Sequence, residues 1–104
     1  MRIAKKEDLP VLTALWARCF GDEEAEILAF WEFLFPDITV FLTEEKTAMA
    51  VAMPIFLGRA RSAYLYAVCT DPAARGKGLC RNLIQFAEQQ LQKMGIEFVF
   101  LVPG

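Results

Sequence analysis

Histidine is absent from the 104 residues of this chain, and its absence excludes a wide range of chemistry. The chain has no Ser-His-Asp triad, no Cys-His nucleophile pair and no histidine general base. Zinc sites with histidine ligands are excluded for the same reason. Any catalysis by this chain therefore relies on other side chains or on backbone groups.

Cysteine is scarce, since only Cys19, Cys69 and Cys80 occur, far apart and without a Cys-x-x-Cys motif. The odd number and the wide spacing argue against a disulfide framework and against a cysteine metal cluster. We therefore expect no metal cofactor. The three cysteines are interpreted as reduced thiols that pack as small apolar residues.

The sequence also lacks a long apolar run and a strong excess of either charge. Its longest apolar stretch, residues 48–57, is about half of what a membrane-spanning helix needs, and it contains Pro54. Residues 1–8 have no apolar core of the signal-peptide kind. The net charge is −2, with 11 basic and 13 acidic residues, which is not typical of a nucleic-acid binder. We therefore expect a cytoplasmic protein whose partners include neither a membrane nor a nucleic acid.

What is present is enough apolar material for one folded domain, because 56% of the residues are hydrophobic. A short strand is expected at residues 2–4, followed by two helices. The first helix is expected to be capped by Asp8 and stopped by Gly21, and the second to be capped by Asp22 and stopped by Pro36. Both helices have apolar stripes at helical spacing. The stripes consist of Leu12, Leu15, Trp16 and Cys19 and of Ile27, Phe30, Trp31 and Leu34, the second widened by Phe33 and Phe35.

The second half of the chain is typical of strands arranged around one helix. Strands are predicted at residues 38–43, 48–57 and 62–70, and the proline in the second of them indicates an edge, a bulge or a strand end. A helix over residues 79–94 has one apolar face. The almost unbroken apolar stretch 96–102 is typical of a strand buried on both faces and parallel to a neighbour. The third strand, the helix and this last strand would make a right-handed βαβ unit.

The segment between the third strand and the last helix carries the clearest chemical signal. It contains the pattern Arg75-x-x-Gly78-x-Cys80, with a second glycine at Gly76. Free N–H groups at a helix start attract an anion, and glycines let the backbone approach a bulky group closely. Residues 59–81 include five basic residues and one acidic residue, a local net charge of +4. This combination indicates a small polyanionic ligand, and a solvated turn is the alternative.

Two common phosphate-binding motifs do not fit this segment. A Walker A loop requires Gly-Lys-Ser/Thr, whereas Gly76-Lys77 is followed by Gly78, and the upstream glycine is missing. The dinucleotide fingerprint Gly-x-Gly-x-x-Gly fails because Arg81 stands at the third glycine.

The pattern Arg75-x-x-Gly78-x-Cys80, between a strand and a helix, resembles the coenzyme A pyrophosphate loop of the GCN5-related N-acetyltransferase (GNAT) superfamily, Gln/Arg-x-x-Gly-x-Gly/Ala. Cys80 stands at the position where the family has glycine or alanine. The runs 66–72 and 98–103 are similar to those of the enhanced-intracellular-survival-like branch. The resemblance implies an α+β, GNAT-like fold. Its sheet would be mixed and mostly antiparallel, with helices on both faces and the element order βααβββαβ.

The resemblance also implies an activity, the transfer of an acetyl group from acetyl-CoA to an amine of an unidentified acceptor. The coenzyme would lie where the two parallel strands diverge. A backbone N–H near Val68 would polarise the thioester carbonyl. The loop of residues 75–80, called the glycine loop below, would surround the pyrophosphate. The residues implied in binding the coenzyme are Val68, Thr70, Arg75, Gly76, Lys77, Gly78, Leu79 and Cys80.

The resemblance assigns no catalytic residue. Glu97 begins the last strand and is a candidate base or simply a strand-end charge. Tyr64 and Tyr66 are typical packing residues, and Cys69 has no histidine to activate it.

In the family the chain continues with a helix, which commonly carries the tyrosine that protonates the leaving thiolate, and with two further strands. The resemblance therefore implies a single domain over residues 1–104, truncated at its C-terminus. Three interpretations stay open: an acetyltransferase, a coenzyme A-binding fragment without turnover, and a structural module that self-associates. An uncovered apolar strand at residues 96–102 favours a homodimer joined through it.

Overall fold

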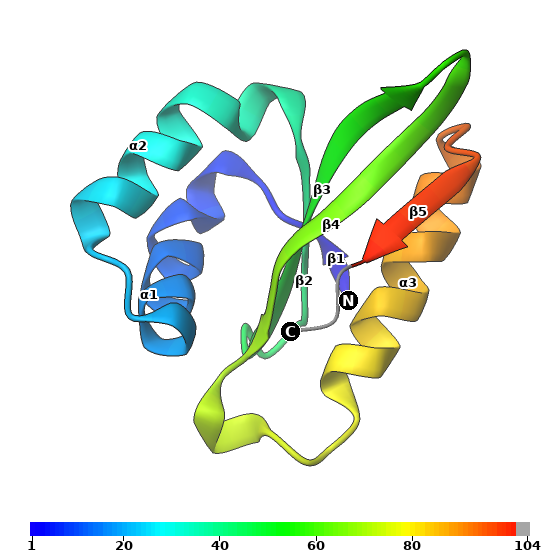
Figure 1. The fold of residues 1–104 in the computed structure, drawn as a ribbon. Coiled ribbons are helices and arrows are strands. Elements are labelled where there is room, and N and C mark those ends of the chain that lie inside the picture. The colour runs from blue at the N-terminus through cyan, green and yellow to red at the C-terminus, as the bar shows by residue number, and fades with distance from the viewer. Residues whose placement is uncertain (102–104) are drawn as a thin grey trace.

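In residues 1–101, five strands form one mixed sheet, which three α-helices cover. The computed structural model describes residues 1–101. Short 3₁₀ turns connect some of the elements, and the predicted order βααβββαβ is confirmed (Figure 1). The elements are β1 (Arg2–Ile3), α1 (Leu9–Phe20), α2 (Glu24–Leu34), β2 (Thr39–Leu42), β3 (Ala48–Leu57), β4 (Ala60–Thr70), α3 (Leu79–Lys93) and β5 (Phe98–Leu101).

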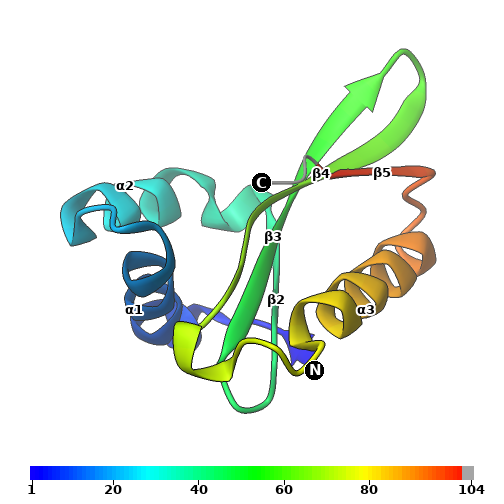
Figure 2. The same cartoon turned by 60° about the horizontal axis from the view of Figure 1, so that its bottom comes forward.

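The sheet separates two layers of helices, with α1 and α2 on one face and α3 on the other (Figures 1 and 2). On the first face, Leu12 of α1 and Trp31 of α2 belong to the same buried cluster as Leu42 of β2. On the other face, Leu83 of α3 lies in a cluster with Phe41. The neighbours Phe41 and Leu42 thus face opposite layers, as the alternation of a strand requires. The predicted α+β class, with helices on both faces, is confirmed.

The strands follow the chain order β1-β2-β3-β4-β5 across the sheet. The first three pairings are antiparallel, and β5 is parallel to β4, with Ser62 opposite Phe98. β4, α3 and β5 therefore form the predicted βαβ unit. The last residue of β3 that pairs with β2 is Ala52, so Pro54 lies on a part of β3 without that neighbour. Pro54 still pairs with Ala63 of β4, and β3 continues to Leu57. Among the described residues the proline therefore lies at an edge of the sheet, in agreement with the edge explanation.

Asp8 precedes α1 as expected, but its side chain does not cap the helix. Its carboxylate accepts hydrogen bonds from Arg2 Nη1 and Nη2 at 2.7 and 2.8 Å, and from the Lys5 N–H at 2.7 Å. These bonds hold the pKa of Asp8 well below its ordinary value, the Arg2 hydrogen bonds contributing most. Asp8 therefore links β1 to the short 3₁₀ turn (Lys6–Asp8) that precedes α1, instead of capping α1 itself.

Asp22 is also not a helix cap, because the N-cap of α2 is Glu23. Asp22 Oδ2 instead accepts a hydrogen bond from Trp16 Nε1 at 2.8 Å. The predicted stop at Gly21 is confirmed, and this glycine has the left-handed conformation that ends α1 (φ 73°).

The buried stripe of α2 is narrower than its sequence indicates. Ile27 and Trp31 are buried, whereas Leu34 is exposed and Phe33 is 77% exposed. The expected widening of the stripe by Phe33 is therefore wrong, since that side of the helix faces away from the sheet.

The last strand is parallel to its neighbour, as predicted, but the expectation that both of its faces are buried is wrong. Phe98 is 54% exposed and Phe100 is 40% exposed. Within residues 1–101, β5 has one strand neighbour, β4, and it forms the edge of the sheet. Val102, the predicted end of this strand, lies outside the described residues.

Candidate functional site

A β-bulge interrupts β4 close to its end. Ala67 and Val68 stand opposite the single residue Ala50 of β3. Ala67 has a φ of 52°, a left-handed conformation that costs a non-glycine residue about 1–2 kcal/mol. A bulge leaves backbone groups unpaired and redirects them, and such strain is typical of functional sites. No glycine marks the position, so sequence reasoning gave no sign of it.

The loop after β4 is held in place by its own polar groups. Asp71 accepts a hydrogen bond from the Ala73 N–H at 3.0 Å and pairs with Arg18 of α1 at 3.0 Å. Both interactions lower the pKa of Asp71, the backbone hydrogen bond contributing most. Arg75 Nε donates to the Thr70 carbonyl at 3.1 Å. These contacts fix the loop between the end of β4 and the start of α3.

The start of α3 presents backbone N–H groups without an acceptor. Gly76 and Gly78 have left-handed conformations, with φ of 85° and 73°, and Gly78 is the N-cap of α3. No side chain caps the helix, so the N–H groups of Leu79 and Cys80 have no partner in the helix. A Cβ built on either glycine meets no atom within 4 Å. The helix start is therefore open to an anion, which the helix dipole also favours.

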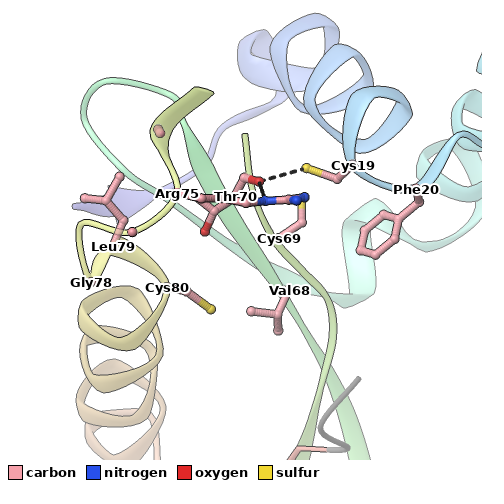
Figure 3. A pocket seen from close by; sticks show the side chains of 11 residues that line it. Cys19, Phe20, Val68, Cys69, Thr70, Arg75, Gly78, Leu79 and Cys80 are labelled. Atoms are coloured by element: carbon pink, nitrogen blue, oxygen red, sulfur yellow. Dashed lines mark hydrogen bonds between the residues drawn. The ribbon is translucent and has the colours of Figure 1, made fainter. Parts of the chain in front are cut away.

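A cavity of about 350 Å³ lies where β4, the loop and α3 meet (Figure 3). The side chains of Val68 and Cys80 point into the space between β4 and α3. Lys77 does not line this cavity, although the sequence placed it with the other loop residues. The remaining residues expected to bind the coenzyme all line it: Val68, Thr70, Arg75, Gly76, Gly78, Leu79 and Cys80.

Two residues from the end of α1, Cys19 and Phe20, complete the wall of this cavity, and sequence reasoning missed both. Cys19 Sγ donates to the Thr70 carbonyl at 3.4 Å. The helical stripe predicts a packed position for Cys19, and the residue is half-buried. The stripe does not reveal that α1 ends beside β4, because that contact depends on the tertiary fold.

The basic residues counted near the loop do not all lie at the cavity. Arg61 is near the start of β4, where its carbonyl accepts from the Glu97 N–H at 2.7 Å. Thr70 lies nine positions further along the strand, roughly 30 Å away at the usual rise per residue. Arg59 precedes the same strand, so neither arginine contributes its charge to the loop. Glu97 lies at that distant end as well, which separates it from the loop.

Cys69 and Tyr66 have the surroundings of structural residues. Cys69 is buried, and burial, followed by the neighbouring Cys19 thiol, raises the pKa of the Cys69 thiol well above its ordinary value. A thiol held neutral in this way is a poor nucleophile. The ring of Tyr66 stacks on Phe30, with 6.0 Å between the ring centroids.

A second cavity of about 300 Å³ lies beside the bulge. Its lining includes Phe20, which it shares with the first cavity, and the bulge residue Ala67. The other lining residues are the aromatic rings of Trp16 and Tyr66, whose centroids are 5.9 Å apart, and Asp22. The two cavities thus meet at one strained segment of β4.

Within residues 1–101, no group of three or more histidine, cysteine, aspartate or glutamate residues is placed to hold a metal ion. In that same part of the chain, no helix has the length and apolar character needed to cross a membrane.

Comparison with known proteins places this fold and loop in a family. The model of the acetyltransferase (GNAT) domain matches residues 1–104. The chain belongs to the GNAT acetyltransferase family. A search of curated proteins gives no match.

Solved structures of GNAT acetyltransferases share the fold. A predicted acetyltransferase from Clostridium acetobutylicum, solved with acetyl-CoA, is 18% identical with a TM-score of 0.76, over 99% of this chain and 79% of that one. Glucosamine-6-phosphate N-acetyltransferase from Arabidopsis thaliana is 18% identical with a TM-score of 0.74, over 99% of this chain and 80% of that one. A probable N-acyltransferase from Enterococcus faecalis is 23% identical with a TM-score of 0.86, over 98% of this chain and 28% of that one.

Proposed function

We propose that this GNAT domain binds acetyl-CoA in the cavity between β4 and α3 and transfers the acetyl group to an amine. The observation that carries the proposal is that the bulge and the uncapped start of α3 line the same cavity. One end of the cavity suits a phosphate group, and the other has backbone groups that have left the sheet. The acetyl-CoA bound to the Clostridium relative supports the choice of ligand.

Each part of the coenzyme has a place in this arrangement. The pyrophosphate lies at the N–H groups of Gly78, Leu79 and Cys80, with Arg75 as counter-charge. The pantetheine amides pair with the backbones of Val68 and Thr70, as an added strand would. The thioester then lies near the bulge, where the N–H of Val68 polarises its carbonyl and stabilises the oxyanion that forms on attack.

The acceptor amine enters through the second cavity, beside the bulge. Trp16, Phe20 and Tyr66 present aromatic rings there, and such rings attract a cation. Asp22 Oδ2 accepts a hydrogen bond from Trp16 Nε1, so Oδ1 is left to bind the ammonium group. Asp22 thereby orients the amine and takes its proton, directly or through water, before attack on the thioester.

The reaction is tested by release of coenzyme A from acetyl-CoA with a panel of primary amines. We expect amine-dependent release by the unaltered chain. Asp22→Asn should lower it at least tenfold, since asparagine keeps an acceptor for Trp16 but has no negative charge. Glu26→Gln on the exposed part of α2 is the matched control and should leave the rate unchanged. Equal rates for Asp22→Asn and Glu26→Gln would remove Asp22 from the mechanism.

A second candidate function is coenzyme binding without turnover. The observation in its favour is that, among residues 1–101, Asp22 is the one carboxylate that lines either of the two cavities. Saturable binding of acetyl-CoA without amine-dependent release would select this alternative. The likeness to the enhanced-intracellular-survival branch and the cytoplasmic location stay predictions from the sequence.

A further inference from the structure

One aromatic side chain stands between the two cavities. Phe20, the last residue of α1, is the one residue among 1–101 that lines both of them. Its ring projects from the end of α1 toward the first cavity (Figure 3). In the second cavity it lies with Ala67 of the bulge. Phe20 therefore marks the boundary between the space proposed for the coenzyme and the space proposed for the amine.

The end of α1 is fixed against β4 and its loop by the two residues before Phe20. Arg18 Nη2 pairs with the Asp71 carboxylate at 3.0 Å. Cys19 Sγ donates to the Thr70 carbonyl at 3.4 Å. Because these two contacts come from successive residues, they hold the backbone that carries the ring at a set distance from the bulge.

The ring of Phe20 packs on a second aromatic side chain that is itself held in place. It lies edge-on to the ring of Trp16, one helical turn earlier, with 6.1 Å between the ring centroids. Trp16 is buried, and its Nε1 donates to Asp22 Oδ2 at 2.8 Å. Phe20 itself is 47% exposed. One part of the ring is thus anchored, and the rest can contact a group that enters from either cavity.

We propose that Phe20 determines the length of the acyl group that this domain transfers, restricting the donor to acetyl-CoA and other short acyl thioesters. The inference rests on the proposed function, which places the thioester near the bulge. An acetyl group adds a single methyl to the thioester carbonyl and leaves the ring of Phe20 undisturbed. A longer acyl chain meets this ring and cannot continue into the second cavity, so that cavity is kept for the amine.

The size of the ring sets the discrimination that we expect. An apolar pocket distinguishes two ligands that differ by one methylene by about tenfold or more. Butyryl-CoA is two methylenes longer than acetyl-CoA, so the unaltered chain should bind it at least tenfold more weakly. In Phe20→Ala the ring is gone and the two cavities join. The butyryl chain can then lie along Trp16 and Tyr66, and the affinities for the two donors should become nearly equal.

The test compares the binding of acetyl-, propionyl- and butyryl-CoA to the whole chain by calorimetry. The readout is the ratio of the butyryl-CoA to the acetyl-CoA dissociation constant, because general damage to the fold would weaken all three donors alike. Phe20→Leu has a smaller side chain that still packs on Trp16. It should give an intermediate ratio, and it serves as the test if Phe20→Ala is unstable. Amine-dependent release of coenzyme A from the same donors should follow the same order.

Phe33→Ala is the matched control, since Phe33 is a 77% exposed phenylalanine of α2 that lines neither cavity. Its ratio should equal that of the unaltered chain. Tight binding of butyryl-CoA by the unaltered chain, or one ratio for the unaltered chain and both Phe20 variants, would overturn the inference while the proposed function stands. If none of the three donors binds, the proposed function fails and the inference fails with it.

Discussion

The substitution Gly78→Glu separates the ligand-binding role of the glycine loop from its structural role. Gly78 has a φ of 73°, and a Cβ at this position points into open space beside the start of α3. A glutamate there brings a carboxylate to the N–H groups that would bind the pyrophosphate. The side chain has room in the free protein, so the main effect should fall on the bound state.

The magnitude follows from two separate effects. The left-handed backbone costs a non-glycine residue about 1–2 kcal/mol of stability. A carboxylate about 5 Å from a phosphate charge, at an effective dielectric constant of about 20, opposes binding by about 3 kcal/mol. That energy corresponds to a loss of affinity of about a hundredfold or more.

Gly58→Glu is the matched control for this experiment. Gly58 has a φ of 62°, it also has no atom within 4 Å of an added Cβ, and it lies in the turn between β3 and β4. Both variants should lose the same stability in thermal unfolding. Calorimetry with acetyl-CoA should give near-normal affinity for Gly58→Glu and at least a hundredfold loss for Gly78→Glu. Equal affinities of the two variants would refute the assignment of the loop.

Three further predictions concern the rest of the molecule. Asp8→Asn should destabilise the fold by about 1 kcal/mol through loss of a charge-assisted hydrogen bond, seen in urea unfolding at neutral pH. Because folding lowers the pKa of Asp8, the stabilisation by its carboxylate is complete above about pH 5 and is lost as the pH falls below about 4. The free energies of unfolding of the variant and of the unaltered chain should therefore become equal in acid. Gly95→Ala should lower the free energy of unfolding by about 1–2 kcal/mol in the same assay, because residue 95 has a φ of 87°. The added Cβ would lie 2.9 Å from Arg61 Nη1, but this flexible side chain can move aside. The chain should form a homodimer through β5, where Phe98 and Phe100 are exposed, and Phe98→Glu should weaken it; a monodisperse monomer at micromolar concentrations in sedimentation would contradict this.

The sequence predicts the order of elements well because the local signals agree with one another. Apolar stripes define α1 and α3, Gly21 marks the end of α1, and the strand–glycine–helix junction marks the loop. A sequence folds to one structure when such local signals agree with the overall fold. Seven of the eight predicted coenzyme-binding residues line one cavity for this reason, since they lie on a single continuous segment.

The features that the sequence does not predict depend on contacts between distant segments. Ala67 carries no signal for a left-handed conformation, and the surrounding sheet imposes it. Cys19 and Phe20 reach the cavity only because α1 ends beside β4. The net charge of +4 over residues 59–81 does not describe the loop itself, because Arg61 lies at the far end of the extended strand β4. An extended segment separates residues in space much faster than a helix or a turn does.

A titration of the chain with acetyl-CoA, followed through the backbone amide signals in NMR spectra, tests most directly whether the coenzyme binds between the bulge and the start of α3. Binding there should give saturable changes for residues 67–70 and 76–81, which cover these two features. The amides of residues 58–61, at the other end of β4, should remain unchanged. An absence of any change, or changes centred on residues 58–61, would show that acetyl-CoA does not bind at this site.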